Sequence, residues 1–513
     1  MLTTDEVAVS ASTARALRIA GLGCLTACGV LALLVGRSGG IEVGRWHVFT
    51  LVGLWTAGGT AACLLLAAAP RRRDAALVVV AALALQVLAL LAGPQLSDDL
   101  YRYVWDGRVA AAGIDPYAAP PDSAQLNRLH EPFLWPSPAG CTTRRRDLPH
   151  AGRADPFAGV DKLRGCTIIN RPEVRTIYPP AAQLAFRAGY ALTPRSAGEL
   201  QAELPAAAYS LGLTGLLLGL LRRSGRPVAW ALLYAATPLG ALETGMDGHI
   251  DVLAALLGVV GVAVLARSQV RCAAAAAVGV LVALATLVKL YPAALAAVAL
   301  PRLGWSPRRT GAFVGAGVLT AAALYAPHVA AVGAQVLGYL PGYLAENGYA
   351  SGDRFALLAL LGVSGPAATV VVAVLLLALV LFSLLRPLPC GEVRAVANRV
   401  VLVVGCAFLL ATPGNAWYCS LLVACAALAG RPEWVLVLMA NYVTYFDAVL
   451  VEQSTWPKVS YAVAAVGVGL AAVLRRRGTR SRMTGSKGAG SKGAGSKGAG
   501  SKGAGSRGAE APA

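Results

Sequence analysis

The sequence predicts an all-helical integral membrane protein, and three observations carry that prediction. Of the 513 residues, 57% are hydrophobic and only 14% are charged, whereas soluble domains carry about 25% charged residues. Apolar runs of roughly 20 residues, the length that crosses a bilayer, recur along most of the chain. Short Arg-rich segments separate many of these runs. We therefore expect a polytopic bundle of about 12–14 transmembrane helices.

The expected spans follow one another with short connections. Because no small-residue cleavage site follows the first apolar run, we expect a retained span rather than a signal peptide. A shorter segment near 291–300 is expected to return the chain from Lys289 to the basic loop at Arg302. The spans are expected near residues 17–36, 48–69, 75–93, 204–221, 227–242, 250–266, 272–289, 311–327, 355–385, 396–412, 416–430, 433–451 and 459–475.

The Arg-rich segments predict the topology. Placing them on the cytoplasmic side of the plasma membrane puts both termini there as well. Attraction to anionic lipid then explains the net charge of +19, and nucleic acid is not expected as a partner. The segments are RRRD (71–74), RRSGR (222–226), RSQVR (267–271), PRLGWSPRR (301–309) and RRRGTRSR (475–482). The loops expected on the extracytoplasmic side are 94–203, 243–249, 328–354, 413–417 and 452–458.

Two regions differ in composition. Residues 1–478 form the expected membrane domain. Residues 479–513 contain four SKGAG repeats, which begin at Ser486. Because Gly, Ser and Lys offer nothing to bury, this tail is expected to be a flexible cytoplasmic extension.

The longest loop, residues 94–203, is expected to be functional, since long loops in compact proteins are usually functional or disordered. Its composition is not that of a disordered segment. Two stretches, LYRYVWDGRVAAAGIDPY and INRPEVRTIYPPAAQLAFRAGYAL, predict amphipathic helices that lie at the membrane interface. Their Tyr and Trp side chains suit the level of the lipid headgroups.

The motif SDDLYRYVWDG follows the third expected span. If Ser97 caps a helix, Asp98 and Asp99 occupy its first turn, a position that favours carboxylates for structural reasons alone. Helical spacing also places Asp99, Tyr103 and Asp106 on one face. Two carboxylates held together can have one pKa raised, which suits a general base.

Three further polar regions fall in loops expected on the same side. Ionisable residues at membrane depth indicate a function, although a solvated turn or a snorkelling lysine is the plain alternative. Lys289 or Arg354 could neutralise a phosphate held just outside the bilayer. Arg171 and Arg175 are further candidates for that role. The regions are ETGMDGHID (243–251), the pair ATLVKLYP (285–292) and SGDRF (351–355), and TPGNAWYCS (412–420).

The chain resembles actinobacterial membrane mannosyltransferases that use a polyprenyl-phosphate sugar and have the GT-C architecture. The resemblance covers roughly residues 75–430. It implies a large extracytoplasmic first loop that is catalytic. It also implies inverting transfer of mannose to a glycolipid or glycan acceptor during cell-envelope biogenesis. The motifs that carry it, in order, are SDDLYRYVWDGRVAAAGIDPY, INRPEVRTIYPPAAQLAF, GHIDVL, KLYP and TPGNAWY.

The resemblance also implies roles for individual residues. In that family an aspartate at the start of the first large loop is the catalytic base, and this role falls to Asp98 or Asp99 without a decision between them. The candidates for contacts with the donor phosphate are Arg102, Tyr178, His249, Lys289 and Arg354. The candidates for acceptor or sugar contacts are Asp106, Asp247, Asp251, Asn415 and Trp417. No metal ligands are assigned. A divalent cation stays open, since the carboxylates and the His of residues 243–251 could hold one, although no motif with metal-binding spacing occurs.

The chain departs from the family in an insertion near residues 137–168, between FLWP and INRP. Cys141 and Cys166 bracket it and, on this topology, face an oxidising compartment, so we expect a disulfide between them. The insertion also carries Arg144–Arg146, which could engage a phosphate-bearing acceptor or an anionic headgroup. It bears on the identity of the acceptor more than on the reaction.

Two alternatives remain open at this point. A flippase or transporter of lipid-linked sugars would be expected to show internal repeats and charged residues at mid-membrane depth, and we find no convincing repeat. The same fold could instead use polyprenyl-phosphate arabinose or glucose as its donor.

Overall fold

The computed structural model describes residues 10–37, 46–68, 70–135, 167–450 and 455–489. The described residues form helices and no β-strand, which confirms the prediction of an all-helical fold. Among them, eight helices are long and apolar enough to cross a membrane, and three shorter apolar helices accompany them. The protein is therefore a helical, multi-pass membrane protein.

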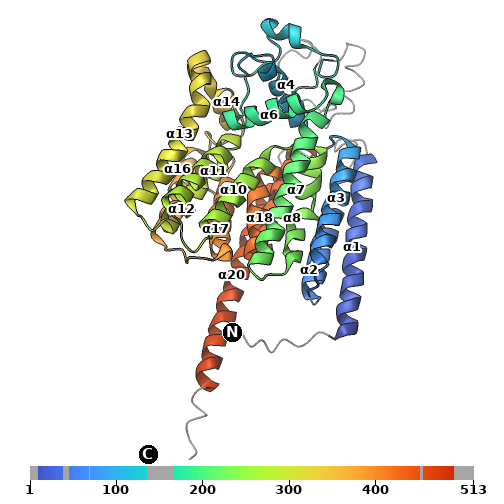
Figure 1. Ribbon diagram of the computed structural model, residues 1–513, viewed down its shortest axis with the longest axis vertical. Coiled ribbons are helices and arrows are strands. Elements are labelled where there is room, and N and C mark those ends of the chain that lie inside the picture. The colour runs from blue at the N-terminus through green and yellow to red at the C-terminus, as the bar shows by residue number, and fades with distance from the viewer. Residues whose placement is uncertain (1–9, 38–45, 69, 136–166, 451–454, 490–513) are drawn as a thin grey trace, which may run out of the picture. The chain divides into compact units, whose positions relative to one another are not determined.

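The helices follow the order of the expected spans (Figure 1). The long ones are α1 (Ala11–Arg37), α2 (Trp46–Ala67), α3 (Asp74–Ala92), α7 (Leu200–Arg223), α13 (Pro307–Val332), α16 (Gly365–Leu385), α17 (Val393–Ala411) and α20 (Trp456–Ala489). The shorter ones are α4 (Asp99–Ala111), α6 (Pro180–Leu192), α8 (Leu232–Ala235), α9 (Pro238–Ala241), α10 (Asp251–Leu265), α11 (Cys272–Val288), α12 (Ala296–Arg302), α14 (Leu340–Glu346), α15 (Ala356–Leu360), α18 (Ser420–Ala429) and α19 (Val435–Leu450). Short 3-10 or π turns join them: η2 (Ala124–Leu129), η3 (Arg195–Ala197), η4 (Val228–Ala231), η5 (Leu242–Met246), η6 (Tyr291–Leu295), η7 (Gly333–Leu337), η8 (Ala416–Cys419) and η9 (Pro432–Trp434).

The expected span at 227–242 is divided into short pieces. Pro238 lacks an amide hydrogen and forces Thr237 into an extended conformation, with φ −121° and ψ 161°. The carbonyl of Gly240 is left outside a regular helix, and it accepts hydrogen bonds from Gln86 Nε2 (2.5 Å) and Ser210 Oγ (2.7 Å). Irregular backbone at this depth is tolerated because neighbouring helices satisfy it.

The expected span at 355–385 is divided as well. The chain turns through Gly362, whose φ of +76° ends α15 in the way that glycine commonly ends helices, before α16 begins at Gly365. Divisions of this kind, together with the shortness of α10, α11 and α18, explain why eight described helices meet the length of a full span rather than 12–14.

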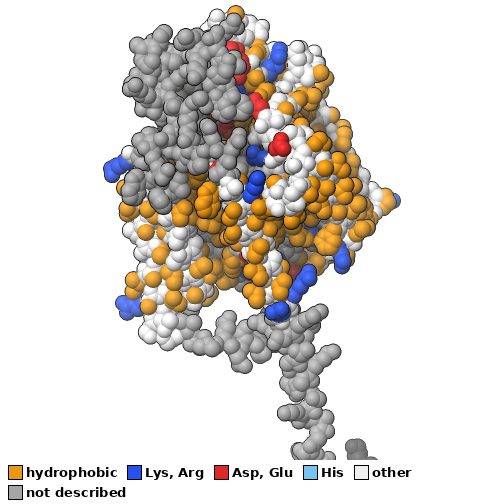
Figure 2. Space-filling view, turned by 180° about the vertical axis from the view of Figure 1, so that it is seen from behind, with side chains coloured by type: hydrophobic (Ala, Val, Ile, Leu, Met, Phe, Trp, Pro, Cys, Tyr) orange, Lys and Arg blue, Asp and Glu red, His pale blue; other side chains and the backbone are white. Residues whose placement is uncertain are grey.

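Apolar side chains cover the outer surface of the long helices. Leu91 on α3, Leu319 on α13 and Leu385 on α16 are each more than 70% exposed. Figure 2 shows such side chains as a broad belt across one face of the molecule. A soluble protein rarely exposes apolar surface of this extent, whereas lipid accommodates it.

The predicted helices of the first large loop are present as α4 and α6, which pack together over one end of the bundle (Figure 1). Their aromatic side chains do not form an exposed interfacial face as expected. Tyr103 and Trp105 are almost fully buried and belong to a core that includes Phe186 of α6, Ile250 and Val288. The first loop therefore packs against the start of α10 and the end of α11.

The end of the chain divides inside α20. The structure forms two units, Met1–Ala465 and Val466–Ala513, so their boundary precedes residue 478. Helix α20 continues to Ala489, so residues 479–489 of the tail that was expected to be flexible are helical. Residues 490–513, which hold most of the SKGAG repeats, lie outside the described residues.

Candidate functional site

Polar segments from five parts of the chain meet where α4 and α6 cover the bundle. Side-chain contacts join Lys289 to Asp251, Tyr178 and Tyr418, and His249 to Trp417. Asp247 binds the backbone that leads into Asp98 and Asp99, so the motifs singled out from the sequence form one cluster. We use "polar cluster" for Asp98, Asp99, Asn170, Tyr178, Asp247, His249, Asp251, Lys289, Trp417 and Tyr418. The Arg-rich loops 71–74, 222–226, 267–271 and 301–309 lie at the other end of the bundle (Figure 1).

Asp98 and Asp99 are held as a pair by one amide. Asp98 is the N-cap residue of α4, and Ser97 Oγ accepts the Asp99 amide hydrogen at 3.2 Å. Asn170 Nδ2 donates to Oδ1 of Asp98 (3.0 Å) and to Oδ1 of Asp99 (2.8 Å). Both aspartates are half-buried. Asn170, about 70 residues further along the loop, thus orients both carboxylates, and both remain partly exposed to solvent.

Asp247, an expected sugar contact, anchors the segment that precedes this pair. Its Oδ1 accepts the backbone amide hydrogens of Gln95 (3.0 Å), Leu96 (2.9 Å) and Ser97 (3.3 Å). The hydroxyl of Tyr445 donates to the Leu96 carbonyl. A fully buried carboxylate that accepts three amides fixes the path of the backbone. Asp247 therefore positions Asp98 and Asp99.

Replacing Asp247 with Ala is expected to lower the melting temperature of the detergent-solubilised protein. Three buried amides would lose their acceptor, and each lost hydrogen bond of this kind costs about 1 kcal/mol or more. The matched control is Glu173→Ala, which removes an exposed acid from the first large loop and should leave the melting temperature unchanged. Equal melting temperatures for wild type and Asp247→Ala would contradict the anchoring role.

Lys289 lies at the centre of the cluster. It follows α11 directly, and its Nζ lies 3.4 Å from Oδ2 of the fully buried Asp251. The same Nζ lies 5.2 Å from the ring centroid of Tyr178 and 4.7 Å from that of Tyr418. Ring faces attract a cation without using its N–H donors. The ammonium is therefore held in place and can still donate to an anionic ligand.

The charge of Asp99 reaches the tyrosines beside Lys289. The Tyr178 hydroxyl donates to that of Tyr103 at 3.4 Å, and the Tyr103 ring stacks on Phe186 at 4.5 Å. Burial raises the pKa of Tyr103 and of Tyr178, and the negative charge of Asp99 raises both pKa values further. Asp99 therefore lies close enough to Tyr178, one of the two rings beside Lys289, for its charge to act there.

His249 is held between an acid and an aromatic ring. Its Nδ1 lies 3.1 Å from Glu243 Oε2 and 3.1 Å from the Glu243 carbonyl oxygen. Its ring stacks on Trp417 with centroids 3.8 Å apart, and Glu243 Oε1 accepts the Tyr442 hydroxyl at 2.5 Å. Burial lowers the pKa of His249, but the hydrogen bond and charge of Glu243 outweigh it, so the pKa is raised.

The pKa values of Asp247 and His249 predict how the stability of the protein depends on pH. Burial and then the charge of Glu243 raise the pKa of Asp247, and the pKa of His249 is raised as well. A group whose pKa is raised by folding stabilises the fold fully below its unfolded pKa, and this contribution is lost as the pH rises through the folded pKa. The melting temperature is therefore expected to fall from about pH 5 to about pH 8.

The variant His249→Gln is expected to show a smaller fall in melting temperature over the same pH range, because the second titrating group is gone. The measurement is the difference between the two melting temperatures of each protein, so an overall loss of stability in the variant does not affect it. A fall as large as in wild type would exclude His249 as a contributor.

Arg102 and Asp106 belong to the scaffold of the loop. Arg102 was expected beside the donor phosphate, one turn after Asp98, but its Nε pairs with Asp106 at 3.1 Å and both residues are less than 5% exposed. Their other hydrogen bonds join α4 to the segment before α6. The partners are the carbonyls of Arg171 and Val174 for Arg102, and the side chains of Thr176 and Gln183 for Asp106.

Arg354 and Asn415 support the turn that presents Trp417 and Tyr418. Arg354 Nε donates to the Thr412 carbonyl at 2.8 Å. Asn415 Nδ2 donates to the hydroxyl of Tyr343 at 3.5 Å, and that hydroxyl lies 3.0 Å from the Tyr418 hydroxyl. The guanidinium of Arg354 is half-buried at the edge of the cluster.

Sequence reasoning missed Asn170 and Tyr343. Asn170 lies in the INRP motif, directly before Arg171, whose φ of +44° is unusual for a residue other than glycine. Arg171 NH2 pairs with Glu346 of α14 at 3.4 Å. The sequence carried no signal for Asn170, because the φ of Arg171 and the partners of Asn170 appear only in the fold.

Some predictions fall outside the described residues. They include Cys141, Cys166 and Arg144–Arg146, so the expected disulfide and the role of the insertion remain predictions. Within the described part of the chain, no group of three or more His, Cys, Asp and Glu side chains could hold a metal ion.

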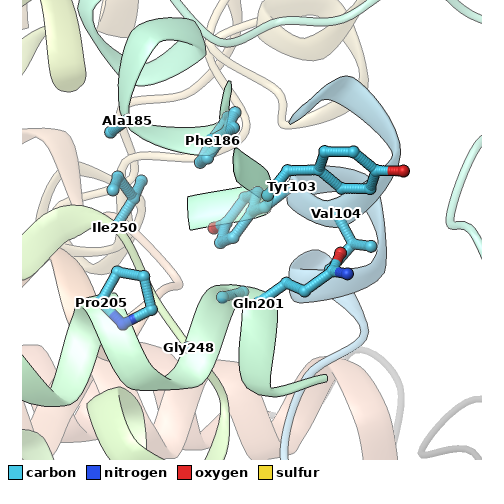
Figure 3. A pocket seen from close by; sticks show the side chains of 10 residues that line it. Tyr103, Val104, Ala185, Phe186, Gln201, Pro205, Gly248 and Ile250 are labelled. Atoms are coloured by element: carbon cyan, nitrogen blue, oxygen red, sulfur yellow. The ribbon is translucent and has the colours of Figure 1, made fainter. Parts of the chain in front are cut away.

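A small pocket lies behind Tyr103, between α4, α6, α7 and the turn before α10 (Figure 3). Phe186 of α6 and Pro205 of α7 face each other across it, with Ile250 and Val104 on its sides. Its lining is mostly apolar and includes none of the charged side chains of the polar cluster. The pocket therefore offers none of the charged groups of the site.

Comparison with known proteins returns no relative: no family model, no curated protein and no solved structure matches the chain.

Proposed function

We propose that the protein transfers mannose from a polyprenyl-phosphate donor to a hydroxyl group of a glycolipid or glycan, on the extracytoplasmic side of the plasma membrane. The observation that supports this most is the juxtaposition of a carboxylate pair and a lysine at one end of a bundle of apolar helices. A polyprenyl chain stays in the bilayer, so its phosphate and the attached sugar lie where such helices end.

Asp99 is the general base of the proposed reaction. It takes the proton from the acceptor hydroxyl while the acceptor oxygen bonds to the anomeric carbon of the sugar. The bond between that carbon and the phosphate oxygen breaks, and its electron pair leaves with the polyprenyl phosphate. A single displacement of this kind inverts the configuration at the anomeric carbon. Asp98 shares the Asn170 amide and holds Asp99 in orientation.

Lys289 stabilises the leaving phosphate. Its ammonium is fixed by Asp251 and by the faces of Tyr178 and Tyr418, so it need not reorganise as negative charge develops on the phosphate oxygen. Cations that are placed in advance at developing charge are usually the largest contribution to catalysis. His249 stacks on Trp417 within the same cluster, and Arg354 holds the turn that carries Trp417.

The resemblance to GT-C mannosyltransferases adds support. That architecture has a large first loop with the base at its start, and here the loop between α3 and α7 begins with Asp98 and Asp99. The loop carries α4 and α6, which cover the end of the bundle that holds the polar cluster.

The experiment that tests this proposal uses the full chain reconstituted in vesicles with radiolabelled polyprenyl-phosphate mannose and a glycolipid extract as acceptor. The expected result is label in a new glycosidic product. Movement of the labelled lipid between leaflets without any product would favour the flippase instead. Transfer from the arabinose or glucose donor, but not from the mannose donor, would support the proposed reaction but show that the donor sugar is not mannose.

A further inference from the structure

Several buried polar atoms of the cluster lack a hydrogen-bond partner among the described residues. They are both carboxylate oxygens of Asp251, Nε2 of His249, Nε1 of Trp417 and the hydroxyl of Tyr291. Asp251 is fully buried, and His249 and Trp417 are at most 3% exposed. A buried polar group without a partner costs about 1–3 kcal/mol. Such groups are uncommon in folded proteins, and each calls for an explanation, such as a bound water, an ion or a role in catalysis.

These atoms surround the side chain of Lys289 and the rings beside it. Asp251 Oδ2 lies 3.4 Å from Lys289 Nζ, which is an ion pair rather than a well-formed hydrogen bond. The Tyr418 ring joins Lys289 to Tyr291, with the two tyrosine centroids 6.4 Å apart, and to Trp417, with centroids 6.2 Å apart. One ligand bound at Lys289 would therefore meet the unpaired atoms as well.

The chemistry of these atoms suits the hydroxyl groups of a sugar. A carboxylate accepts two or more hydrogen bonds from hydroxyls, the indole of Trp417 donates one, and aromatic faces pack against the apolar side of a sugar ring. A purely anionic ligand would not use Asp251, because two negative charges would then lie side by side. The neutral, hydroxyl-bearing part of the donor is the group that fits.

We infer that Asp251 recognises the donor sugar by accepting a hydrogen bond from the hydroxyl on the carbon next to the anomeric carbon. This inference rests on the proposed function. With the donor phosphate on Lys289, the neighbouring carboxylate meets the part of the sugar closest to the phosphate, and the hydroxyl adjacent to the anomeric carbon is the nearest one. Mannose and glucose differ in configuration at that carbon, so Asp251 discriminates between them.

The test compares two donors that differ by one hydroxyl: polyprenyl-phosphate mannose and its 2-deoxy analogue. Wild type is expected to lose roughly 10- to 100-fold in kcat/KM on the deoxy donor, because a hydrogen bond to a charged group is lost. In Asp251→Ala the ratio between the two donors should fall to near one. Asp251→Asn, which keeps the size of the side chain, should give a ratio between these values.

The matched control is Asp74→Asn, which alters another buried acid that pairs with a cation, Arg18. Any effect of the control on folding reduces the rates on both donors equally and leaves their ratio as in wild type. The same wild-type ratio in Asp251→Ala and Asp251→Asn would overturn the inference, since Asp251 would then only hold Lys289. If wild type transfers sugar from neither donor, nor from the glucose or arabinose donor, the proposed function itself fails.

Discussion

Replacing Asp99 with Asn is expected to reduce the rate of sugar transfer by about a thousandfold, without loss of folded protein. A positioned general base contributes roughly 10²- to 10⁴-fold to a rate, and an amide cannot take the acceptor proton. Asn keeps the size of the side chain and an oxygen that can accept from Asn170 Nδ2. The measurement is the initial rate of labelled product formation in vesicles with a saturating donor, together with the melting temperature of each protein.

The matched variant for this prediction is Asp98→Asn. Asp98 is bound to the same amide at a similar distance, and the proposed reaction gives it the role of orienting Asp99. A loss of no more than about tenfold is expected for Asp98→Asn, through poorer orientation of its neighbour. A greater loss in Asp98→Asn than in Asp99→Asn would assign the base to Asp98.

Replacing Lys289 with Met is expected to reduce the transfer rate by about 10²- to 10³-fold. The loss follows from removing a preorganised charge that stabilises the leaving phosphate, and losses of this size are typical for such groups. Met keeps about the length of the side chain but removes the ammonium that lies over the rings of Tyr178 and Tyr418. The measurement is kcat and KM for the labelled donor, and the larger change is expected in kcat.

The control for this prediction is Lys458→Met, which removes an exposed lysine from the start of α20 and should leave both constants unchanged. Arg354→Met provides a comparison within the cluster. Arg354 holds the Thr412 carbonyl, so a smaller loss is expected from it. If Arg354→Met lost most of the activity while Lys289→Met kept it, the phosphate contact would belong to Arg354.

The positions of most helices follow from the sequence, because length and hydropathy are local properties. The run that ends at Ala92 and the Arg-rich segments predicted both the helix α3 and the gathering of polar loops at one end. The broken segment around Pro238 could not be predicted in the same way. Its irregular backbone is stable only because Gln86 and Ser210 come from other helices to satisfy the Gly240 carbonyl.

The sequence predicted which residues belong to the candidate site, but not which role each of them has. The motifs named Asp98, Asp106 and Asp247 alike as acidic residues of interest. Only their partners show that Asp106 and Asp247 hold the loop while Asp98 stays accessible. Asn170 had no such signal, since an asparagine acquires its importance from two carboxylates some 70 residues earlier in the chain.

The most direct test of direct transfer from a polyprenyl phosphate is the anomeric configuration of the product. The purified chain would be given polyprenyl phosphate carrying β-linked mannose labelled with carbon-13 at the anomeric carbon, and the one-bond carbon–hydrogen coupling of the product would be measured by NMR. A single displacement, with Asp99 as base and Lys289 on the leaving phosphate, predicts an α-linked product. A β-linked product, or the absence of any labelled glycoside, would contradict it.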